Sequence, residues 1–389
     1  MRFHHPRLYA LLIPSRAETV AAIRRVWDGG DAVLVLDPAA PAQERDRLIK
    51  TLAPDALIDA SGTHHFNGSP PLPAGVAAVV ATSGSTGEPK GVMLSWAAME
   101  ASARAACARI GQARGDRWLL CLPLHHVAGL MVLVRAWLAG TEPVVHERFD
   151  PALVAQTEDV SFVSLVPTML AALLDADVEV ARYKGILLGG APVPDEVVRT
   201  ARRAGARVTL TYGMSETCGG CVYDGLPLEG VEMRIGEDSE ILLRGPVVME
   251  GYRARPDLTF AAFRDGWFHT NDVGRIEDGR LRVLGRADDM IVTGGEKVAP
   301  GEVTAILRQH PDIEDAYVTG VRDDKWGQRV VAYLACPGER PSLEEVRDFV
   351  AQRTARYKAP RQVMYVNSVP RTALGKVKTA ALPNPGAGE

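Results

Sequence analysis

The sequence predicts an α/β protein, with a large amino-terminal domain of mostly parallel sheets flanked by helices and a small α+β domain at the carboxyl end. Two observations carry this prediction. Up to about residue 220, short apolar runs alternate with amphipathic stretches, the pattern of parallel strands joined by helices. Beyond that point, short alternating runs are separated by turn pairs such as Asp265-Gly266, which indicates antiparallel strands and a small β-barrel subdomain.

The composition is that of a globular protein with room for about two to three domains. The chain has 389 residues, of which 47% are hydrophobic and 24% charged. Its net charge of -4 provides no general attraction to polyanions, so we expect no nucleic acid partner. No apolar run approaches the roughly 18 residues of a membrane helix, so we expect no transmembrane segment. The five cysteines, an odd number in a long chain, argue against a disulfide framework, and we expect a cytoplasmic protein.

Five apolar runs in the first half are predicted to be buried strands, namely 32–36, 76–81, 118–121, 160–166 and 185–188. Helices are predicted at 18–27, 41–52, 95–110, 130–138, 168–174 and 195–204. Ser95 is a suitable N-cap for the third helix, and Gly111 a suitable end. The apolar stretch 8–13 is too short for a secretory signal. The stretch 61–74, rich in Gly, Pro and Ser, is predicted to be a loop.

The second half of the chain contains two further sequence patterns. Alternating runs at 232–235, 240–244 and 280–284 indicate the antiparallel barrel, over residues 222–287. A compact α+β unit follows, with helices at 301–309 and 343–354 and strands near 316–321, 330–335 and 362–366. We place the domain boundary at Asp288, which gives domains 1–287 and 288–389, with residues 1–75 as a short leading lobe.

The most informative segment is the glycine-rich loop 82–91, directly after the apolar run 76–81. Its glycines let backbone N–H groups turn toward a ligand, its hydroxyls add donors and Lys90 adds a positive charge, which suits a polyphosphate. It is not a Walker loop, because Glu88-Pro89-Lys90 follows Gly87. The alternative is a flexible surface turn, which the position after a buried strand disfavours. The predicted phosphate-binding residues are Thr82, Ser83, Gly84, Ser85, Thr86, Gly87 and Lys90.

This loop and the segments that follow it resemble, in order, the motifs of the acyl-adenylate-forming superfamily (acyl-CoA synthetases, nonribosomal adenylation domains and luciferases). The resemblance spans roughly residues 76–380. The further segments are PLHHVAG at 123–129, GGAP at 189–192, YGMSET at 212–217, WFHTND at 267–272, GRADD at 285–289, TGGE at 293–296 with Glu302, and PRTALGK at 370–376.

The resemblance implies two half-reactions. A carboxylate attacks the α-phosphate of ATP and forms an acyl-adenylate and pyrophosphate, and a thiol, usually that of coenzyme A, then displaces AMP. The first step brings two anions together, so it needs cations and aimed donors more than an acid–base pair. By resemblance, Lys376 bridges the carboxylate and the α-phosphate, and Glu216 binds Mg²⁺. Ser215, where the family usually has threonine, donates to the α-phosphate.

The resemblance also implies the nucleotide and hinge residues. Asp272 accepts hydrogen bonds from the ribose, Arg286 supports the ribose or the phosphates, and Tyr212 lies against the adenine. Asn271 replaces the usual glycine and leaves the local turn open. Asp288 matches the hinge of a mobile carboxyl-terminal domain. The remaining predicted positions are Gly190, Ala191, Pro192, Gly213 and Met214 around the adenine, and Gly294 and Gly295, which line a coenzyme A tunnel or form an ordinary turn.

The short leading lobe and the segment 123–138 are similar to the ligases of menaquinone biosynthesis, a group in this superfamily that activates o-succinylbenzoate. This substrate has two carboxylates, so the one that is not activated needs a cationic or hydrogen-bonding partner and the ring needs apolar walls. Arg135 is either that partner or a structural arginine paired with a carboxylate, and both alternatives stay open. The other predicted substrate-side residues are His126, Leu188, Gly189 and Gly213, with Val132 as a neighbour.

Histidines and cysteines predict no metal site. Adjacent pairs such as His125-His126 point apart on a strand, and Cys218 and Cys221 lack the second pair or histidine cluster that a zinc site needs. We therefore expect the two cysteines to be small residues beside the acyl pocket.

Three rival functions remain. They are a coenzyme A ligase for another aromatic or medium-chain acid, an adenylation domain that loads a carrier protein, and a regulatory protein that binds nucleotide without catalysis. The joint presence of Lys376, Glu216 and Asp272 opposes the last. The oligomeric state is open, and a homo-oligomer is compatible with the sequence.

Overall fold

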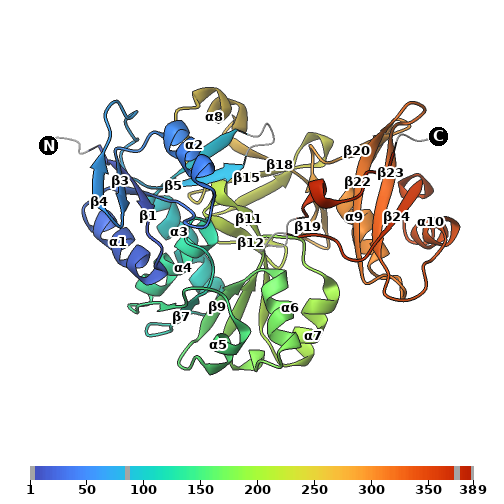
Figure 1. Ribbon diagram of the computed structural model, residues 1–389, viewed down its shortest axis with the longest axis horizontal. Helices are drawn as coiled ribbons and strands as arrows, with labels where there is room; N and C mark the ends of the chain where they lie inside the picture. The colour runs from blue at the N-terminus through green and yellow to red at the C-terminus, as the bar shows by residue number, and fades with distance from the viewer. Residues whose placement is uncertain (1–4, 84–87, 372–376, 387–389) are drawn as a thin grey trace. The chain divides into compact units, whose positions relative to one another are not determined.

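The computed structural model describes residues 5–83, 88–371 and 377–386 (Figure 1). The chain divides into two compact units. Unit 1 comprises residues 1–233 and 243–269, and unit 2 comprises residues 234–242 and 270–389. Asp288 thus lies inside unit 2. The domain boundary proposed at this residue is a hinge for movement during the reaction, and it stays a prediction. Within the described ranges, no helix combines the length and the apolar character that crossing a membrane requires.

The first sheet of unit 1 is mixed and contains the glycine-rich hairpin. Its order is β16 (Gly251–Tyr252), β6 (Pro89–Ser95), β5 (Val76–Ser83), β2 (Ala32–Val35), β1 (Leu8–Leu12), β3 (Ala56–Asp59) and β4 (Gly62–His65). The four central strands, from β5 to β3, run parallel, and the strands at both edges are antiparallel. Helices α1 (Arg16–Asp28) and α2 (Ala42–Leu52) connect the parallel strands.

Strand β1 of this sheet was not predicted, and one expectation was wrong. The apolar stretch 8–13, judged only as too short for a secretory signal, contains this strand, whose Leu8, Ala10 and Leu11 are fully buried. The predicted loop 61–74 contains the edge strand β4, which is exposed at all four residues and is held by antiparallel pairing with β3. A short polar edge strand has no hydrophobic alternation, because neither of its faces enters the core.

The second sheet of unit 1 is predominantly parallel, as predicted. Its order is β13 (Leu226–Pro227), β12 (Gly219–Tyr223), β11 (Val208–Met214), β10 (Gly185–Leu188), β9 (Phe162–Leu165), β7 (Trp118–Leu120) and β8 (Val144–Val145). Strands β8, β7, β9, β10 and β11 are parallel, and β12 and β13 are antiparallel. The helices are α3 (Trp96–Ile110), α4 (Val127–Leu138), α5 (Pro151–Gln156), α6 (Pro167–Asp175) and α7 (Asp195–Arg203), with α6 and α7 side by side (Figure 1).

Helix α3 shows how local sequence sets the bounds of an element. Ser95 accepts a hydrogen bond from the backbone N–H of Ala98, and Gly111 ends the helix in the left-handed conformation, with φ 69°. Both residues were predicted for these positions, because a hydroxyl satisfies a free N–H at the start and glycine adopts positive φ without strain.

The antiparallel region is an open sheet rather than a barrel. Its described strands have the order β14 (Glu232–Ile235), β15 (Glu240–Arg244), β18 (Trp267–Glu277) and β17 (Phe263–Arg264), and β19 (Arg280–Arg286) pairs with β18. The order does not return to β14, so the strands do not close. Alternating short strands predict antiparallel pairing, but closure depends on strand number and stagger, which the pattern does not contain. Helix α8 (Pro256–Ala262) precedes β17.

The carboxyl-terminal part of unit 2 has its own sheet and core, as predicted. The sheet order is β21 (Glu296–Val298), β20 (Ile291–Thr293), β23 (Gly327–Ala335) and β22 (Asp315–Asp323), and β24 (Gln362–Val366) runs parallel to β23. Helices α9 (Pro300–Leu307) and α10 (Leu343–Ala351) pack against these strands in one core, through Val303, Leu307, Val346 and Val350. The 3-10 helices of the chain are η1 (Val180–Arg182), η2 (Ser215–Thr217), η3 (Glu237–Ser239), η4 (Arg356–Lys358) and η5 (Thr379–Ala381).

Candidate functional site

The glycine-rich loop joins two antiparallel strands of a hairpin. Strands β5 and β6 pair so that Thr82 lies opposite Lys90 and Ser83 opposite Pro89. The hairpin therefore brings Lys90 back beside the end of β5, where the loop begins. The predicted residues Gly84, Ser85, Thr86 and Gly87 lie outside the described residues, as does Lys376.

The exit of this hairpin is braced by the segment that follows β16. A Cβ on Gly91 would lie 2.6 Å from Leu52 and 2.9 Å from Val79, so any larger residue would displace these packed side chains. The backbone N–H of Arg253 donates to Gly91 O at 2.8 Å, and Arg255 lies 3.6 Å from the carboxylate of Glu88.

Arg253 also ties this segment to the leading lobe. Its buried guanidinium donates to the carbonyl oxygens of Leu52, Ala53 and Pro70. The sequence does not reveal this role, because Arg253 stands in a polar stretch and its partners lie about 200 residues earlier in the chain. A polar run directly after Gly251-Tyr252 was the only available signal.

The segments predicted to lie beside the adenine meet at one edge of the second sheet. Strands β10 and β11 are parallel neighbours, with Leu188 opposite Leu210, so the segments that follow them leave from the same edge. A Cβ on Gly189 would lie 2.2 Å from Thr211 Oγ1, and Gly190 has φ 82°. Both positions therefore need glycine for this turn. The predicted Ala191 and Pro192 follow on this side, and Tyr212, Gly213 and Met214 lie at the end of β11.

The turn after β11 presents Ser215 and Glu216. Thr217 is fully buried beneath them: its Oγ1 accepts from Met214 N at 3.0 Å and donates to Gly219 O at 2.8 Å. A Cβ on Gly213 would lie 2.0 Å from Gly219 O, so β11 and β12 approach each other only because this residue is glycine. This packing fixes the backbone of η2.

A tyrosine connects this turn to the hairpin. The Tyr252 hydroxyl donates to Glu216 Oε1 at 2.9 Å, and the Lys90 ammonium lies 5.3 Å from the centroid of the Tyr252 ring. The backbone N–H of Met249 donates to Glu216 O at 2.8 Å. Among the described residues, Glu216 Oε2 has no hydrogen-bond or ion-pair partner. A half-buried carboxylate with one oxygen held and the other available suits a hard divalent cation.

His126 lies at the start of α4 with its ring against that of His125, with 4.3 Å between the centroids. The expectation that these two side chains point apart was wrong, because they occupy a turn before a helix and not a strand. Burial, with a smaller contribution from His125, lowers the pKa of His126 to about 4. At neutral pH the ring is therefore uncharged, so it can form a hydrogen bond but carries no positive charge.

Arg135 lies about 13 Å further along α4, at 1.5 Å per residue, toward the amino ends of the strands. Its guanidinium covers the Trp118 ring at 4.5 Å, and Nη2 donates to Ser164 Oγ at 3.1 Å. No described carboxylate pairs with it, and Nε has no partner among the described residues. The structure thus favours the structural alternative for Arg135, with an aromatic ring in place of the expected carboxylate.

The two cysteines near this turn are buried free thiols. Burial raises the pKa of Cys218 and raises that of Cys221 to about 12, so both stay protonated and unreactive at neutral pH. Leu188, predicted on the substrate side, is fully buried in the core of the second sheet. No cluster of three metal-binding side chains occurs in the part of the chain that the structure describes.

In unit 2, the predicted ribose residues pair with each other. Asp272 and Arg286 are opposite residues of β18 and β19, and Arg286 Nη1 lies 3.2 Å from Asp272 Oδ1. The buried Thr270 hydroxyl accepts from Asp272 N at 3.0 Å and donates to Ile241 O at 2.7 Å. Asn271 takes φ 58°, the left-handed conformation in which glycine and asparagine are both tolerated, which explains the replacement of the usual glycine.

The Gly294–Gly295 pair forms the turn between β20 and β21, with φ 61° and 85°. Two positive φ values are typical of a tight hairpin, so the turn explains both glycines, and the coenzyme A tunnel stays a prediction. Glu302 accepts from Lys358 Nζ at 2.7 Å and thereby braces α9 against η4.

The segment that carries the predicted Lys376 is closed at its base. Arg371 bridges to Val377, and Lys378 N donates to Pro370 O at 2.8 Å. The Arg371 guanidinium lies 2.9 Å from Asp315 Oδ2, which ties this base to the start of β22.

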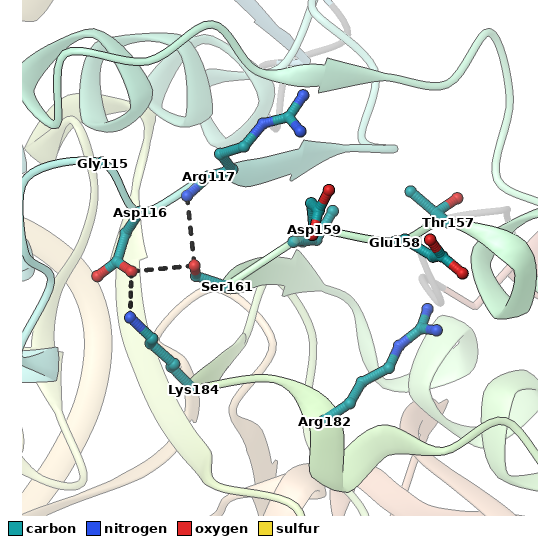
Figure 2. Close-up of a pocket in the computed structure, with 10 residues that line it drawn as sticks. Gly115, Asp116, Arg117, Thr157, Glu158, Asp159, Ser161, Arg182 and Lys184 are labelled. Atoms are coloured by element: carbon teal, nitrogen blue, oxygen red, sulfur yellow. Dashed lines mark hydrogen bonds and ion pairs between the residues drawn. The ribbon is translucent and has the colours of Figure 1, made fainter.

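A surface pocket of about 640 Å³ lies elsewhere in unit 1 (Figure 2). Its residues Arg117, Ser161 and Lys184 directly precede β7, β9 and β10, so it opens at the amino ends of parallel strands, away from the adenine-side edge. Figure 2 shows Lys184 and Ser161 both bonded to Asp116. Burial raises the pKa of Asp116, but the hydrogen bonds from Lys184, Ala113 and Ser161 outweigh it and lower the pKa. No residue predicted for the site lines this pocket, and two of its charged residues, Lys184 and Asp116, pair with each other.

The family whose model matches this chain is AMP-binding enzyme, over residues 59–253. The model of the AMP-binding enzyme C-terminal domain matches residues 302–376. Among curated relatives, the probable 2-succinylbenzoate–CoA ligase of Mycobacterium tuberculosis is 42% identical over 403 aligned positions, which cover 98% of this chain and 99% of the relative.

Two solved structures of o-succinylbenzoate CoA synthetase from Bacillus subtilis have the same fold. The complex with the acyl-adenylate intermediate is 30% identical, has a TM-score of 0.85 and covers 99% of this chain and 90% of the other. The complex with ATP and a magnesium ion is 29% identical, has a TM-score of 0.83 and covers 97% and 90%.

Proposed function

The chain belongs to the family of AMP-binding enzymes, and on that premise we propose that it is an ATP-dependent, AMP-forming ligase that joins o-succinylbenzoate to coenzyme A. Relatives similar over nearly the whole chain support the substrate, since the Mycobacterium tuberculosis relative is named a probable 2-succinylbenzoate–CoA ligase. Such a ligase acts in menaquinone biosynthesis.

The observation that carries the proposal is the convergence of a cation and a carboxylate beside the glycine-rich hairpin. Lys90 and Glu216 come from different segments of unit 1 and contact the ring and the hydroxyl of the same tyrosine, Tyr252. The chemistry of ATP requires this combination, because phosphate oxygens need an ammonium and a metal ion needs a carboxylate.

In the first half-reaction, a carboxylate oxygen of the substrate bonds to the α-phosphorus, and the bond from that phosphorus to the departing pyrophosphate breaks. Lys90 neutralises phosphate charge, Ser215 donates to the α-phosphate and Lys376 steadies the attacking carboxylate. Glu216 would hold Mg²⁺ through Oε2. Bound Mg²⁺ supplies positive charge that bridges phosphate oxygens.

In the second half-reaction, the thiol sulfur of coenzyme A attacks the acyl carbon, AMP leaves with the electrons of the broken C–O bond, and the thiol proton passes to solvent. In our proposal the carboxyl-terminal domain turns at Asp288 between the two steps, which withdraws Lys376 and admits the thiol beside Gly294 and Gly295. Asp272 and Arg286, which pair at the end of β19, hold the ribose through both steps.

The enzyme is proposed to be cytoplasmic. All five cysteines, which lie in the described part of the chain, are free, as in proteins of a reducing compartment.

A carboxylic acid panel tests the function. The purified chain is assayed for acid-dependent ATP–pyrophosphate exchange and for AMP release with coenzyme A, using o-succinylbenzoate, benzoate, malonate and octanoate. We expect kcat/KM for o-succinylbenzoate to exceed the others by about 100-fold or more. Benzoate and octanoate leave the polar groups that bind the second carboxylate unpaired, and malonate has no ring to fill the apolar part of the pocket. Glu216→Gln should abolish exchange, whereas Glu250→Gln, at an exposed glutamate two positions before Tyr252, should not.

Two outcomes would contradict the proposal. Activity on octanoate or benzoate without activity on o-succinylbenzoate would replace the substrate. No exchange with any acid would leave only the protein that binds nucleotide without catalysis.

A further inference from the structure

Tyr252 stands between two groups that the proposed function assigns to ATP and magnesium, and none of the motifs in the sequence analysis includes it. Its side chain is almost completely buried, with 8% of the residue exposed. A buried tyrosine needs a partner for its hydroxyl, and here that partner is the carboxylate of Glu216, at 2.9 Å. Its ring faces the ammonium of Lys90 at 5.3 Å.

The backbone fixes the place of this ring. Tyr252 is the last residue of β16, which pairs with β6 so that Tyr252 lies opposite Val92 and Gly251 opposite Met93. The Tyr252 N–H donates to Thr259 Oγ1 at 2.9 Å, which anchors the same residue to α8. Gly251 has φ 137°, and a Cβ there would lie 2.6 Å from Thr259 Cγ2. The ring is therefore held by a sheet and a helix before any ligand binds.

From this geometry we propose that Tyr252 is a positioning residue, which orients the Glu216 carboxylate for the metal ion and the Lys90 ammonium for the phosphates. The inference rests on the proposed function. The hydroxyl occupies Oε1 and directs Oε2 away from it, so the carboxylate does not rotate freely between orientations. The ring keeps the ammonium near the hairpin, because a cation is attracted to the face of an aromatic ring.

The proposal predicts a defect specific to the metal. Groups that orient a metal-binding carboxylate typically change metal affinity or activity by about 10- to 100-fold when they are removed. Tyr252→Phe removes the hydroxyl and keeps the ring, so it should weaken the magnesium-dependent part of ATP binding by about 10-fold. ATP without magnesium, and AMP, should bind as to the original chain.

Three measurements test this with the full chain. Titration calorimetry gives the Kd of ATP with and without Mg²⁺. The magnesium dependence of o-succinylbenzoate-dependent exchange should shift to about 10-fold higher concentration. Transfer of a supplied acyl-adenylate to coenzyme A should stay unchanged. Pyrophosphate takes no part in that step, so no magnesium ion is needed to neutralise its charge. Tyr183→Phe is the control, since it removes a buried hydroxyl that accepts from Arg182 at 3.0 Å and lies outside the site.

Two further variants distinguish a positioning role of Tyr252 from a purely structural role. If Tyr252 acts through Glu216, Tyr252→Phe should add no further loss of magnesium-dependent ATP binding in the Glu216→Gln background. Tyr252→Leu, which also removes the ring, should in addition weaken binding of ATP without magnesium, because Lys90 loses its support.

The inference is overturned if Tyr252→Phe leaves both magnesium responses unchanged, or if both half-reactions fall in parallel with thermal stability. Failure of the proposed function looks different. In that case the original chain shows no acid-dependent exchange, while the calorimetric effect of Tyr252→Phe on magnesium-dependent ATP binding still decides the role of Tyr252.

Discussion

Asn271 donates a hydrogen bond from Nδ2 to Oδ2 of Asp288 at 2.6 Å. The residue that replaces the usual glycine of its motif thus holds the residue predicted to be the hinge. Both lie in unit 2. Asn271 directly precedes the part of β18 that pairs with β19, and Asp288 lies two residues beyond the end of β19. Movement at Asp288 therefore requires either that this hydrogen bond breaks or that Asn271 moves together with Asp288.

Asn271→Gly should alter the balance of the half-reactions with little effect on folding. Glycine accepts φ 58°, and Asp288 is exposed, so we expect the free energy of unfolding to change by less than about 1 kcal/mol. Single-turnover rates of acyl-adenylate formation and thiol transfer should change in ratio by about 2-fold or more. Asn271→Asp, which sets two carboxylates together, should shift the ratio further in the same direction. Unchanged ratios in both variants would show that the bond does not control the hinge.

Lys376→Ala should remove the first half-reaction and spare the second. Loss of one aimed cation typically lowers the rate by about 10²–10³. Lys378→Ala is the matched control, because Lys378 is exposed and lies just beyond the bridge at the base of the same segment. Exchange measures the first step, and transfer from a supplied acyl-adenylate measures the second. Equal losses in both steps would contradict the domain movement.

His126 should make the protein less stable in mild acid. Its pKa is lowered to about 4 by burial, while an unfolded histidine titrates near 6.5, so the unfolded chain binds the extra proton between these values. The stability from the neutral ring is complete above pH 6.5 and is lost as the pH falls toward 4. When the pH falls from 7 to 4.5, the unfolding free energy of His126→Gln should decrease by about 1–2 kcal/mol less than that of the original chain. This figure allows for the partial exposure of the ring.

Denaturant titrations across that pH range measure this difference. His65→Gln is the control, since His65 is exposed on the edge strand β4. Identical pH profiles for His126→Gln and the original chain would mean that the ring is charged in the folded protein.

Arg135→Met should leave substrate binding intact. The guanidinium is buried without a described carboxylate, so removing it relieves a desolvation cost that offsets the lost contacts to Trp118 and Ser164. We expect the unfolding free energy to change by no more than about 1 kcal/mol and KM for o-succinylbenzoate by less than about 2-fold. A 10-fold rise in KM at unchanged stability, rescued by Arg135→Lys, would instead assign the second carboxylate to this residue.

Much of the fold was predictable because periodicity and capping are local. The parallel strands β2, β5, β7, β9 and β10, and helix α3 with its caps Ser95 and Gly111, follow from apolar runs and turn residues in their own segments. Strand β4 and the open order of the β14–β19 region were not predictable in this way. The first has no apolar face, and the second depends on which strands pair.

The motifs determined the chemical class by themselves, since hydroxyls, glycines, a lysine and a glutamate at the family's spacing already imply ATP and an acyl-adenylate. Tertiary structure alone decided how those groups are supported. Tyr252 reaches Glu216 across 36 positions of sequence, and Arg253 reaches the carbonyl of Ala53 across 200. A sequence pattern records side chains within one element, whereas contacts between distant elements arise only when sheets and helices pack, and those contacts orient the reacting groups.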